Sequence, residues 1–234
     1  MHISTSNVTV IIPAAGVGQR FGSVLPKQYT NVCGIPIIIR TLSTIVSLPF
    51  VRSVVIAKSA TDVIISELIT THLPQHAEIH LVTGGEQRVD SVLAALQHES
   101  VSDSDVVLIH DAVRPLASPS LFMRVLDATI TTGAAIPGIP VTDTIKELDV
   151  KGAVARTVPR ENLRAIQTPQ GFRSDVVKQL LQSESNGATD EAMLAERCGI
   201  RVTVVDGEPW NIKITTPTDI NLVEALLPYN PSLS

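Results

Sequence analysis

Two cations and several small residues lie together in one stretch near the start of the chain, over residues 13–27. The stretch begins Pro13-Ala-Ala-Gly-Val-Gly18 and also contains Arg20 and Lys27. Because glycine has no side chain, such a loop can bring backbone N–H groups close to an anion. Cations beside those N–H groups favour a multiply charged anion, such as the phosphate chain of a nucleotide.

The spacing within this stretch excludes two familiar phosphate-binding loops. A Walker A loop needs a glycine before its lysine and Ser or Thr after it, but Lys27 lies between Pro26 and Gln28. A dinucleotide fingerprint needs G-x-G-x-x-G and an acid about 20 residues later. Here the third glycine, Gly22, lies one residue too far along, and the first acid of the chain is Asp62. The pattern therefore argues against a P-loop NTPase and a nicotinamide dehydrogenase.

The first quarter of the chain is positive although the whole protein is acidic. Five Lys or Arg residues precede Asp62 with no acid among them, whereas the formal net charge of all 234 residues is −5. Such an asymmetry indicates a local site for an anion. We assign Arg20 and Lys27 to that site and interpret the other three cations as solvated surface charges.

A further candidate follows an apolar run in the middle of the chain. Asp111 lies just after residues 105–110, at the kind of strand end where ligands bind in open α/β sheets. A carboxylate there can hold Mg²⁺ against phosphate oxygens, because Mg²⁺ often takes only one or two protein ligands. The alternative is that Asp111 caps the next turn, and Arg114 either assists Asp111 or simply pairs with it.

Other segments also carry polar or charged candidates. Gly84-Gly-Glu-Gln-Arg88, with Ser91 beyond it, is a glycine turn that can recognise a base and ribose through backbone groups. Arg160 and Lys213 are isolated cations, and Lys213 falls in a segment of otherwise apolar character. The six histidines form no pattern of metal ligands.

The segments that must position these residues alternate between strands and helices. Strands are expected at residues 8–12, 53–57, 78–83, 105–110, 134–139, 201–205 and 211–215. Helices are expected at 37–48, 62–72, 90–98, 119–132, 174–182, 189–197 and 218–227, with a turn at 168–172. Thr189-Asp-Glu191 is typical of an N-cap with acids in the first turn. This alternation predicts an α/β fold, with a Rossmann-like, mostly parallel sheet and helices on both faces.

Residues 142–166 interrupt the alternation. Two short strands, 144–148 and 153–158, flank a turn and predict a β-hairpin that projects as an arm. An arm with apolar residues usually buries them against something, so we expect it to serve dimerisation with a second subunit. The length suits one α/β domain, and we assign residues 1–234 to a single domain with this arm as an insertion.

Composition limits the partners and the compartment. Only 3% of the residues are aromatic and the net charge is −5, which argues against binding nucleic acid. The sequence shows neither a membrane span nor a signal-peptide pattern, so we expect no membrane association. Cys33 and Cys198 are isolated thiols that suit a reducing cytoplasm.

Seven motifs occur in order along residues 8–227. They are Pro13-Ala-Ala-Gly-x-Gly-x-Arg20, Pro26-Lys-Gln28, Asp111-Ala-x-Arg-Pro115, Asp143-Thr144, Thr168-Pro-Gln170, Thr189-Asp190 and Asn211-Ile-Lys213. Together they resemble the 2-C-methyl-D-erythritol 4-phosphate cytidylyltransferase family of the non-mevalonate isoprenoid pathway. Each motif alone is weak, but seven in register are specific.

The resemblance implies transfer of a cytidylyl group from CTP to methylerythritol 4-phosphate, giving 4-diphosphocytidyl-2-C-methyl-D-erythritol and pyrophosphate with Mg²⁺ as cofactor. It implies a homodimer clasped through the arm, with Arg160 reaching the neighbouring subunit's site. It places the triphosphate at Ala14, Ala15, Gly16, Gly18, Arg20 and Lys27, the cytidine at Gly85, Glu86, Ser91 and Ala112, and the metal at Asp111. It places the acceptor at Thr144, Arg160, Thr168, Thr189 and Lys213, and makes Arg20, Lys27, Arg160 and Lys213 the catalytic cations.

The residue chemistry agrees with this activity. A phosphate nucleophile is already anionic near neutral pH because its second pKa is about 6, so the site needs no general base. Two alternatives stay open: a ribitol 5-phosphate cytidylyltransferase, whose pattern is similar, and a non-catalytic nucleotide-binding module. The presence of Arg20, Lys27, Asp111 and Lys213 disfavours the second alternative.

Overall fold

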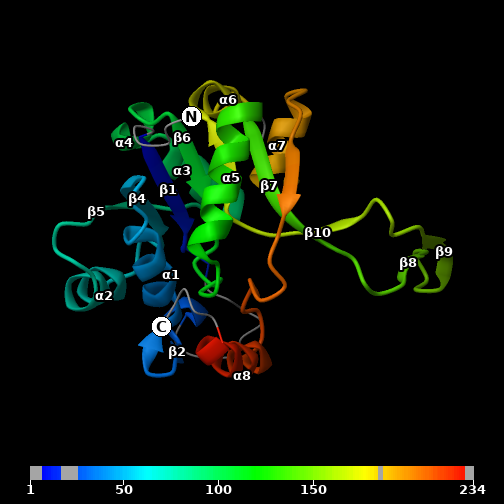
Figure 1. The fold of residues 1–234 in the computed structure, drawn as a ribbon, viewed down its shortest axis with the longest axis horizontal. Coiled ribbons are helices and arrows are strands. Elements are labelled where there is room, and N and C mark those ends of the chain that lie inside the picture. The colour runs from blue at the N-terminus through cyan, green and yellow to red at the C-terminus, as the bar shows by residue number, and fades with distance from the viewer. Residues whose placement is uncertain (1–6, 17–25, 184–186, 230–234) are drawn as a thin grey trace.

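A computed structural model describes residues 7–16, 26–183 and 187–229, and an eight-stranded sheet lies at its centre (Figure 1). Its strands are β1 (Val8–Pro13), β4 (Val51–Lys58), β5 (Glu78–Thr83), β6 (Val106–Ile109), β7 (Ala134–Pro140), β10 (Arg164–Ile166), β11 (Gln170–Arg173) and β12 (Thr203–Asp206). Their order is β10-β7-β11-β6-β1-β4-β5, with β12 alongside β7. β1 pairs in parallel with β4 and β6, whereas β11 runs antiparallel between β6 and β7.

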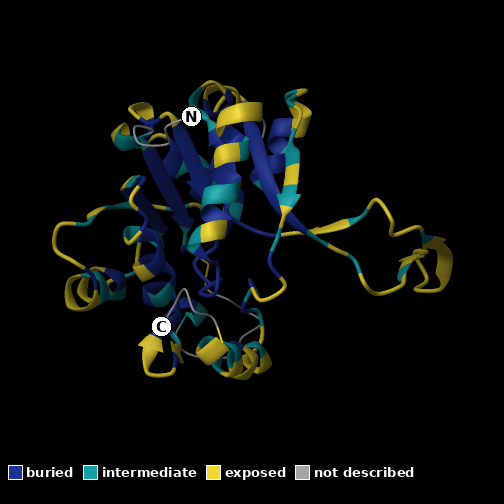
Figure 2. Cartoon of the chain, in the orientation of Figure 1, coloured by how far each residue is buried: buried dark blue, intermediate teal, exposed yellow. Residues whose placement is uncertain are grey.

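Helices cover both faces of this sheet. They are α1 (Ile37–Val46), α2 (Ile64–His72), α3 (Arg88–Leu96), α4 (Glu99–Ser102), α5 (Pro119–Thr132), α6 (Ser174–Leu180), α7 (Glu191–Arg197) and α8 (Pro217–Leu226). Alternate side chains of a strand point to opposite faces, so Val10 and Ile12 pack with α1 and α5, whereas Ile11 packs with α3 and α6. The predicted α/β fold, mostly parallel with two covered faces, is confirmed (Figure 2). In the described part of the chain, no helix is long and apolar enough to span a membrane.

The central parallel strands end at one edge of the sheet. In their register Pro13 lies opposite Ala57, and Ile11 lies opposite Ile109. The loops after β1 and β6 therefore leave the sheet side by side, which is the place where open α/β sheets bind ligands. A small hairpin of β2 (Asn31–Val32) and β3 (Ile35–Pro36) and helix α8 cover the chain near this edge (Figure 1).

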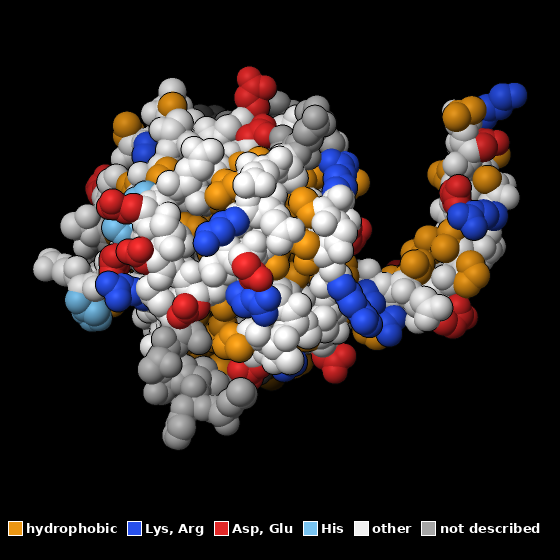
Figure 3. All heavy atoms as spheres, turned by 90° about the horizontal axis from the view of Figure 1, so that it is seen from above, with side chains coloured by type: hydrophobic (Ala, Val, Ile, Leu, Met, Phe, Trp, Pro, Cys, Tyr) orange, Lys and Arg blue, Asp and Glu red, His pale blue; other side chains and the backbone are white. Residues whose placement is uncertain are grey.

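The predicted hairpin is present and projects from the body of the molecule (Figures 1 and 3). β8 (Ile145–Leu148) and β9 (Val154–Val158) pair in antiparallel fashion as a separate two-stranded sheet. Leu148 and Val154 are 57% and 59% exposed, and Val150 in the turn is fully exposed. Within one chain, the arm thus leaves apolar side chains uncovered.

The predicted turn at residues 168–172 is wrong over its second half, which forms β11. Phe172 is fully buried in this strand. A Cβ at Gly171 would clash with Thr129 Oγ1 and would lie 3.1 Å from side-chain atoms of Leu108 and Val125, so only glycine fits this approach. A short strand with Pro and Gly at its start carries no alternating pattern, and the pairing of β11 with β6 and β7 therefore gives no signal in the sequence.

The predicted strand at residues 211–215 is also wrong, because this segment joins no sheet. Its backbone is tied by single hydrogen bonds, such as Ile214 N to the Val113 carbonyl at 2.9 Å. The side chain of fully buried Asn211 donates to the Thr168 carbonyl at 2.9 Å. A buried polar side chain, instead of a strand ladder, holds the segment in place.

Candidate active site

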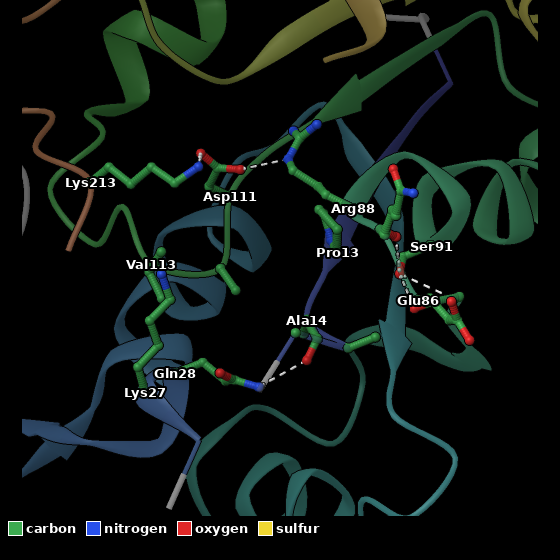
Figure 4. Close-up of a pocket in the computed structure, with 15 residues that line it drawn as sticks. Pro13, Ala14, Lys27, Gln28, Glu86, Arg88, Ser91, Asp111, Val113 and Lys213 are labelled. Carbon is green, nitrogen blue, oxygen red and sulfur yellow. Dashed lines mark hydrogen bonds and ion pairs between the residues drawn. The ribbon is translucent and has the colours of Figure 1, made fainter. Parts of the chain in front are cut away.

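A cavity of about 320 Å³ opens at the edge of the sheet where β1 and β6 end (Figure 4). Five separate stretches of the chain line it. The lining residues are Pro13, Ala14, Ala15, Gly16, Lys27, Gln28, Gly85, Glu86, Gln87, Arg88, Ser91, Asp111, Ala112, Val113 and Lys213. The loops at the ends of the parallel strands therefore converge on one site.

The loop after β1 forms one wall with its backbone. Ala14 N donates to the Ala57 carbonyl at 2.7 Å, and Gln28 Nε2 donates to the Ala14 carbonyl at 2.8 Å. An added Cβ at Gly16 would meet no atom of the described residues within 4 Å. With respect to these residues, the missing side chain at Gly16 leaves space through which an anion can approach the backbone.

The glycine turn after β5 forms another wall and packs against the first. A Cβ at Gly84 would lie 2.7 Å from both Ala15 Cβ and Ser91 Oγ, so a side chain cannot fit there. Gly85 N donates to Ser91 Oγ at 3.2 Å, which ties the turn to the first residues of α3. The close approach of Gly84 to Ala15 sets the spacing between the two glycine loops.

Asp111 follows β6 and carries a buried carboxylate that contacts three cations. Its Oδ2 lies 3.0 Å from Lys213 Nζ and 3.1 Å from Arg114 Nε, and its Oδ1 lies 3.0 Å from Arg88 Nε. Figure 4 shows Asp111 between Lys213 and Arg88. Burial alone would raise the pKa of Asp111, but the cations outweigh burial and hold that pKa well below its usual range. The carboxylate is therefore ionised at neutral pH.

Arg88 links Asp111 to a second buried carboxylate, Glu191 at the start of α7. Arg88 Nη1 lies 2.8 Å from both oxygens of Glu191, whose side chain is fully buried. Burial would lower the pKa of Arg88, but Glu191 and Asp111 together hold it above its ordinary value. Burial raises the pKa of Glu191, and the charge of Arg88 opposes that rise in part.

Hydrogen bonds to the buried side chains of Thr168 and His110 fix the backbone around Asp111. Thr168 Oγ1 accepts from Asp111 N at 3.0 Å and lies 3.0 Å from His110 Nδ1. His110 Nε2 lies 3.3 Å from the Arg114 carbonyl, and since a carbonyl only accepts, Nε2 must carry the proton. The Thr168 hydroxyl then donates to Nδ1. Burial lowers the pKa of His110 to about 4, which matches a neutral imidazole.

Lys213 and Lys27 are brought to the same side of the cavity by the segment before α8. Ile214 N donates to the Val113 carbonyl at 2.9 Å, next to the Asp111 loop. Lys27 Nζ in turn donates to the Ile214 carbonyl at 3.3 Å. Ile214 directly follows Lys213 in the chain and accepts a hydrogen bond from Lys27, so its backbone holds the two lysines near each other.

A family model described as 2-C-methyl-D-erythritol 4-phosphate cytidylyltransferase matches residues 8–228 of this chain. The chain belongs to this family. The predicted family, its cytidylyltransferase class and the α/β fold are therefore confirmed.

Similar proteins and solved structures match this chain over nearly its whole length. A 2-C-methyl-D-erythritol 4-phosphate cytidylyltransferase of Symbiobacterium thermophilum is 43% identical, covering 94% of this chain and 92% of the relative. One of Frankia casuarinae is 40% identical, covering 97% and 84%. The crystal structure of the Francisella tularensis enzyme has a TM-score of 0.79 at 32% identity, covering 95% of this chain and all of that one.

The structure brings ten of the predicted cytidylyltransferase residues together in the cavity. They are Ala14, Ala15, Gly16, Lys27, Gly85, Glu86, Ser91, Asp111, Ala112 and Lys213. Gly18 and Arg20 lie outside the described residues. The roles of all these residues toward CTP stay predictions.

Four residues predicted to bind the acceptor are not part of the cavity lining. Thr144 and Arg160 are exposed on the arm, and Thr189 is exposed just before α7. Thr168 is only 4% exposed, and its hydroxyl is engaged behind Asp111. The acceptor contacts of these four residues stay predictions, and Thr168 has in addition a structural role that the sequence did not indicate.

Sequence reasoning missed the ion pair of Arg88 with Glu191. Arg88 was considered only as the last residue of a glycine turn, with no role for its side chain, and Glu191 only as an acid in the first turn of a helix. The expected capped start of this helix is present, with Asp190 as the N-cap of α7 and Glu191 in its first turn: Asp190 Oδ1 accepts from Met193 N at 3.0 Å. The pair joins residues 103 positions apart, and no local pattern marks such a contact. Arg114 pairs with Asp111, which was one of its two expected roles.

Asp111 fits a divalent cation that is held mainly by phosphate oxygens. Within the described residues, no group of three or more His, Cys, Asp or Glu side chains could hold a metal alone. Mg²⁺ commonly binds through one or two carboxylates plus the phosphates of a substrate. The ionised carboxylate of Asp111, which lines this cavity, suits that mode of binding.

Proposed function

We propose that this cavity is the active site in which the chain transfers a cytidylyl group from CTP to 2-C-methyl-D-erythritol 4-phosphate and releases pyrophosphate. The observation that carries the proposal is the ionised Asp111 carboxylate among three cations, beside two glycine loops, in a chain of this family. Two polyanionic substrates must be held together in this reaction, and a cavity rich in cations offsets their repulsion.

The two glycine loops are assigned to CTP. The triphosphate is assigned to Ala14, Ala15, Gly16, Gly18, Arg20 and Lys27, and the cytidine to Gly85, Glu86, Ser91 and Ala112. Support comes from the arrangement in Figure 4, where Lys27 approaches the cavity from one side and Ser91 and Glu86 from another. A nucleotide laid across the cavity then has its charged end at the lysines and its base at the Gly85 turn.

The reaction is a displacement at the α-phosphorus of CTP. An oxygen of the acceptor phosphate forms a bond to that phosphorus, and the bond to the oxygen bridging toward the β-phosphate breaks. Pyrophosphate leaves with the electron pair. The nucleophile is already an anion near neutral pH, so no residue has to remove a proton. Lys27 and Lys213 hold the reacting groups and stabilise the charge on the α-phosphate and the leaving group.

Asp111 is assigned to hold Mg²⁺ together with phosphate oxygens of CTP. When bound, the metal would neutralise phosphate charge as a Lewis acid. Among the three cations on Asp111, Lys213 has the most exposed side chain, at 38%. Of the three cations, Lys213 can therefore most easily leave its ion pair with Asp111 and bind a phosphate oxygen instead.

The acceptor is assigned to Thr144, Arg160, Thr168, Thr189 and Lys213, in a site completed by a homodimer. Arg160 lies on the exposed arm, outside the cavity of its own chain. The apolar side chains along the arm (Figure 3) need cover. A second copy packed on the arm supplies that cover and brings each Arg160 toward the partner's cavity.

The protein is further assigned to the cytoplasm, with neither nucleic acid nor membrane among its partners. Cys33 and Cys198 are both free thiols. The formal net charge of −5 disfavours attraction of a nucleic acid to the protein as a whole.

The proposal is tested by pyrophosphate release from CTP and Mg²⁺ with two acceptors offered separately. We expect turnover with 2-C-methyl-D-erythritol 4-phosphate and none with ribitol 5-phosphate. Turnover with ribitol 5-phosphate alone would keep the CTP site but overturn the acceptor. No pyrophosphate release with either acceptor, despite CTP binding, would indicate a non-catalytic nucleotide-binding module.

Arg160→Ala tests the arm's part in the acceptor site. We expect the KM for the acceptor phosphate to rise about tenfold, because a charged hydrogen bond is lost, while CTP affinity is retained. Arg156→Ala is the matched control, since Arg156 is an exposed arm cation paired with Glu147. A KM that rises equally in both variants would show that arm folding, and not Arg160, is responsible.

A further inference from the structure

Glu191 is a fully buried carboxylate that does not line the cavity but contacts a residue that does. Both of its oxygens lie 2.8 Å from Nη1 of Arg88, and Arg88 Nε lies 3.0 Å from Asp111 Oδ1. The reaction as described above assigns Glu191 no role. A buried charge is costly unless it is paired, so its presence next to the cavity calls for a physical account.

The chain holds the carboxylate of Glu191 firmly in place. Gln170, on β11, donates from Nε2 to Asp190 Oδ2 at 2.8 Å and accepts from Ala192 N at 3.2 Å. These bonds fix the residues on both sides of Glu191 to the strand that pairs with β6. Since Asp111 follows β6, Glu191 and Asp111 are fixed to one rigid frame with Arg88 between them.

The charges around Asp111 are balanced by Glu191. Arg88, Arg114 and Lys213 supply three positive charges and Asp111 one negative charge. Glu191 supplies the second negative charge, since both of its oxygens lie within ion-pair distance of Arg88 Nη1. Without that charge, Asp111 would be the only anionic partner of Arg88 among the described residues, and the net positive charge at the Asp111 carboxylate would rise by one. A divalent cation binds less well in a more positive field, whereas a triphosphate binds no less well.

We propose that Glu191 is a positioning residue for the metal site: by engaging Arg88 it keeps the Asp111 carboxylate able to accept a divalent cation. The proposal rests on the proposed function, in which Asp111 holds Mg²⁺. Glu191 acts here through Arg88 and touches neither substrate. A role in packing alone would weaken metal and nucleotide binding together, so the two roles can be separated.

Glu191→Gln is the test, because it keeps the side chain's shape and one acceptor while it removes the charge. CTP binding is measured by calorimetry in EDTA and at increasing Mg²⁺, and pyrophosphate release is measured over the same Mg²⁺ series. We expect half-saturation to need about tenfold more Mg²⁺ in both assays, with CTP affinity in EDTA equal to or tighter than that of the wild type. Glu196→Gln, an exposed acid on the same helix, is the matched control and should behave as the wild type.

An unchanged Mg²⁺ requirement in Glu191→Gln overturns the proposal, as does CTP affinity in EDTA that falls together with metal affinity. Glu191→Asp keeps the charge but withdraws it by one methylene, so we expect an intermediate rise, about threefold. No rise in Glu191→Asp overturns the proposal even where Glu191→Gln does not fold. A wild type that turns over without Mg²⁺ would remove the proposed metal as well, whereas a Mg²⁺-dependent wild type with unshifted variants removes only the role of Glu191.

Discussion

Asp111, Glu191, Arg88, Arg114 and Lys213 form a cluster of ion pairs, here called the Asp111 cluster. The β8–β9 arm also contains a short ion pair, but the two regions differ in how far their charged side chains are exposed to solvent. In the cluster, the Asp111 side chain is 7% exposed and touches three cations at 3.0–3.1 Å. On the arm, Arg156 and Glu147 approach to 2.6 Å, but their side chains are 66% and 52% exposed. The shorter pair on the arm contributes less to the free energy of unfolding, because solvent screens exposed charges and each side chain must be ordered to make the contact.

The comparison shows where a single chain determines its own geometry. Every charge of the cluster is held by backbone or by another buried side chain, as Thr168 holds Asp111 and Gln170 holds the start of α7. The arm has only its own hairpin pairing and exposes Leu148 and Val154. The charges of the cluster are therefore held within one chain, whereas the arm leaves apolar side chains exposed.

The largest expected effect is on turnover, through Lys27→Ala. Removal of a cation from the reacting phosphates should lower kcat by about 10²- to 10³-fold, as the loss of one transition-state contact does elsewhere. The free energy of unfolding should change little, because Lys27 is only half-buried. Steady-state pyrophosphate release measures the effect, with Lys178→Ala, at an exposed position of α6, as the control. Normal turnover in Lys27→Ala would remove this lysine from the reaction.

Asp111→Asn should produce the largest loss of stability. It leaves Arg88, Arg114 and Lys213 without a shared anion, and breaking such a buried set costs about 3 kcal/mol or more. Glu147→Gln makes the same chemical change in the exposed arm pair and should cost less than about 1 kcal/mol. Urea unfolding of the two variants measures both values. Equal losses would contradict the contrast between the cluster and the arm.

Acid should lower the free energy of unfolding through His110, which lies next to Asp111 in the chain. Burial lowers the pKa of His110 from 6.5 to about 4, so between these values the unfolded chain binds a proton that the folded chain does not. The stability that His110 contributes is therefore complete above pH 6.5 and is lost as pH falls toward 4, by up to roughly 3 kcal/mol. Urea unfolding of metal-free protein across this range measures the slope. His110→Gln should flatten it, and an unchanged slope would show that other groups dominate.

The smallest effect on the isolated chain is expected on the arm. Leu148→Asp places a charge on an apolar position of the hairpin that we assign to the dimer interface. Sedimentation should show dissociation to monomers at concentrations where the wild type is dimeric, while urea unfolding at dilutions where both are monomeric changes by less than about 0.5 kcal/mol. Glu147→Gln is the control and should stay dimeric. A dimeric Leu148→Asp would place the interface elsewhere.

The sequence predicted those parts of the fold whose signals are local. The buried run of residues 8–12, the helix at Pro119–Thr132 and the hairpin arm each carry their own periodicity or turn residues, and the structure confirms them. β11 was mistaken for a turn because its place in the sheet depends on Gly171 fitting against Thr129 of α5, a contact between distant segments. The segment at 211–215 has a strand-like composition, but a buried asparagine holds it outside the sheet.

The same distinction applies to the site. Glycine loops and isolated cations are visible along the chain, so residues such as Lys27, Asp111 and Lys213 were predicted and lie together in the cavity. Arg88 and Glu191 were missed because a buried ion pair between residues 103 positions apart has no sequence period. The polar contacts that hold a site in place are therefore harder to predict than the groups that face the ligand.

The bond between Lys27 Nζ and the Ile214 carbonyl has a consequence for how the protein is made. Chains are synthesised at about 5–20 residues per second, and a domain generally folds as a unit. The cavity lacks Lys213, and Lys27 lacks the Ile214 carbonyl, until these residues leave the ribosome. A nascent chain therefore cannot form its complete site before its last segment is made, and nucleotide is expected to bind fully only to the finished enzyme.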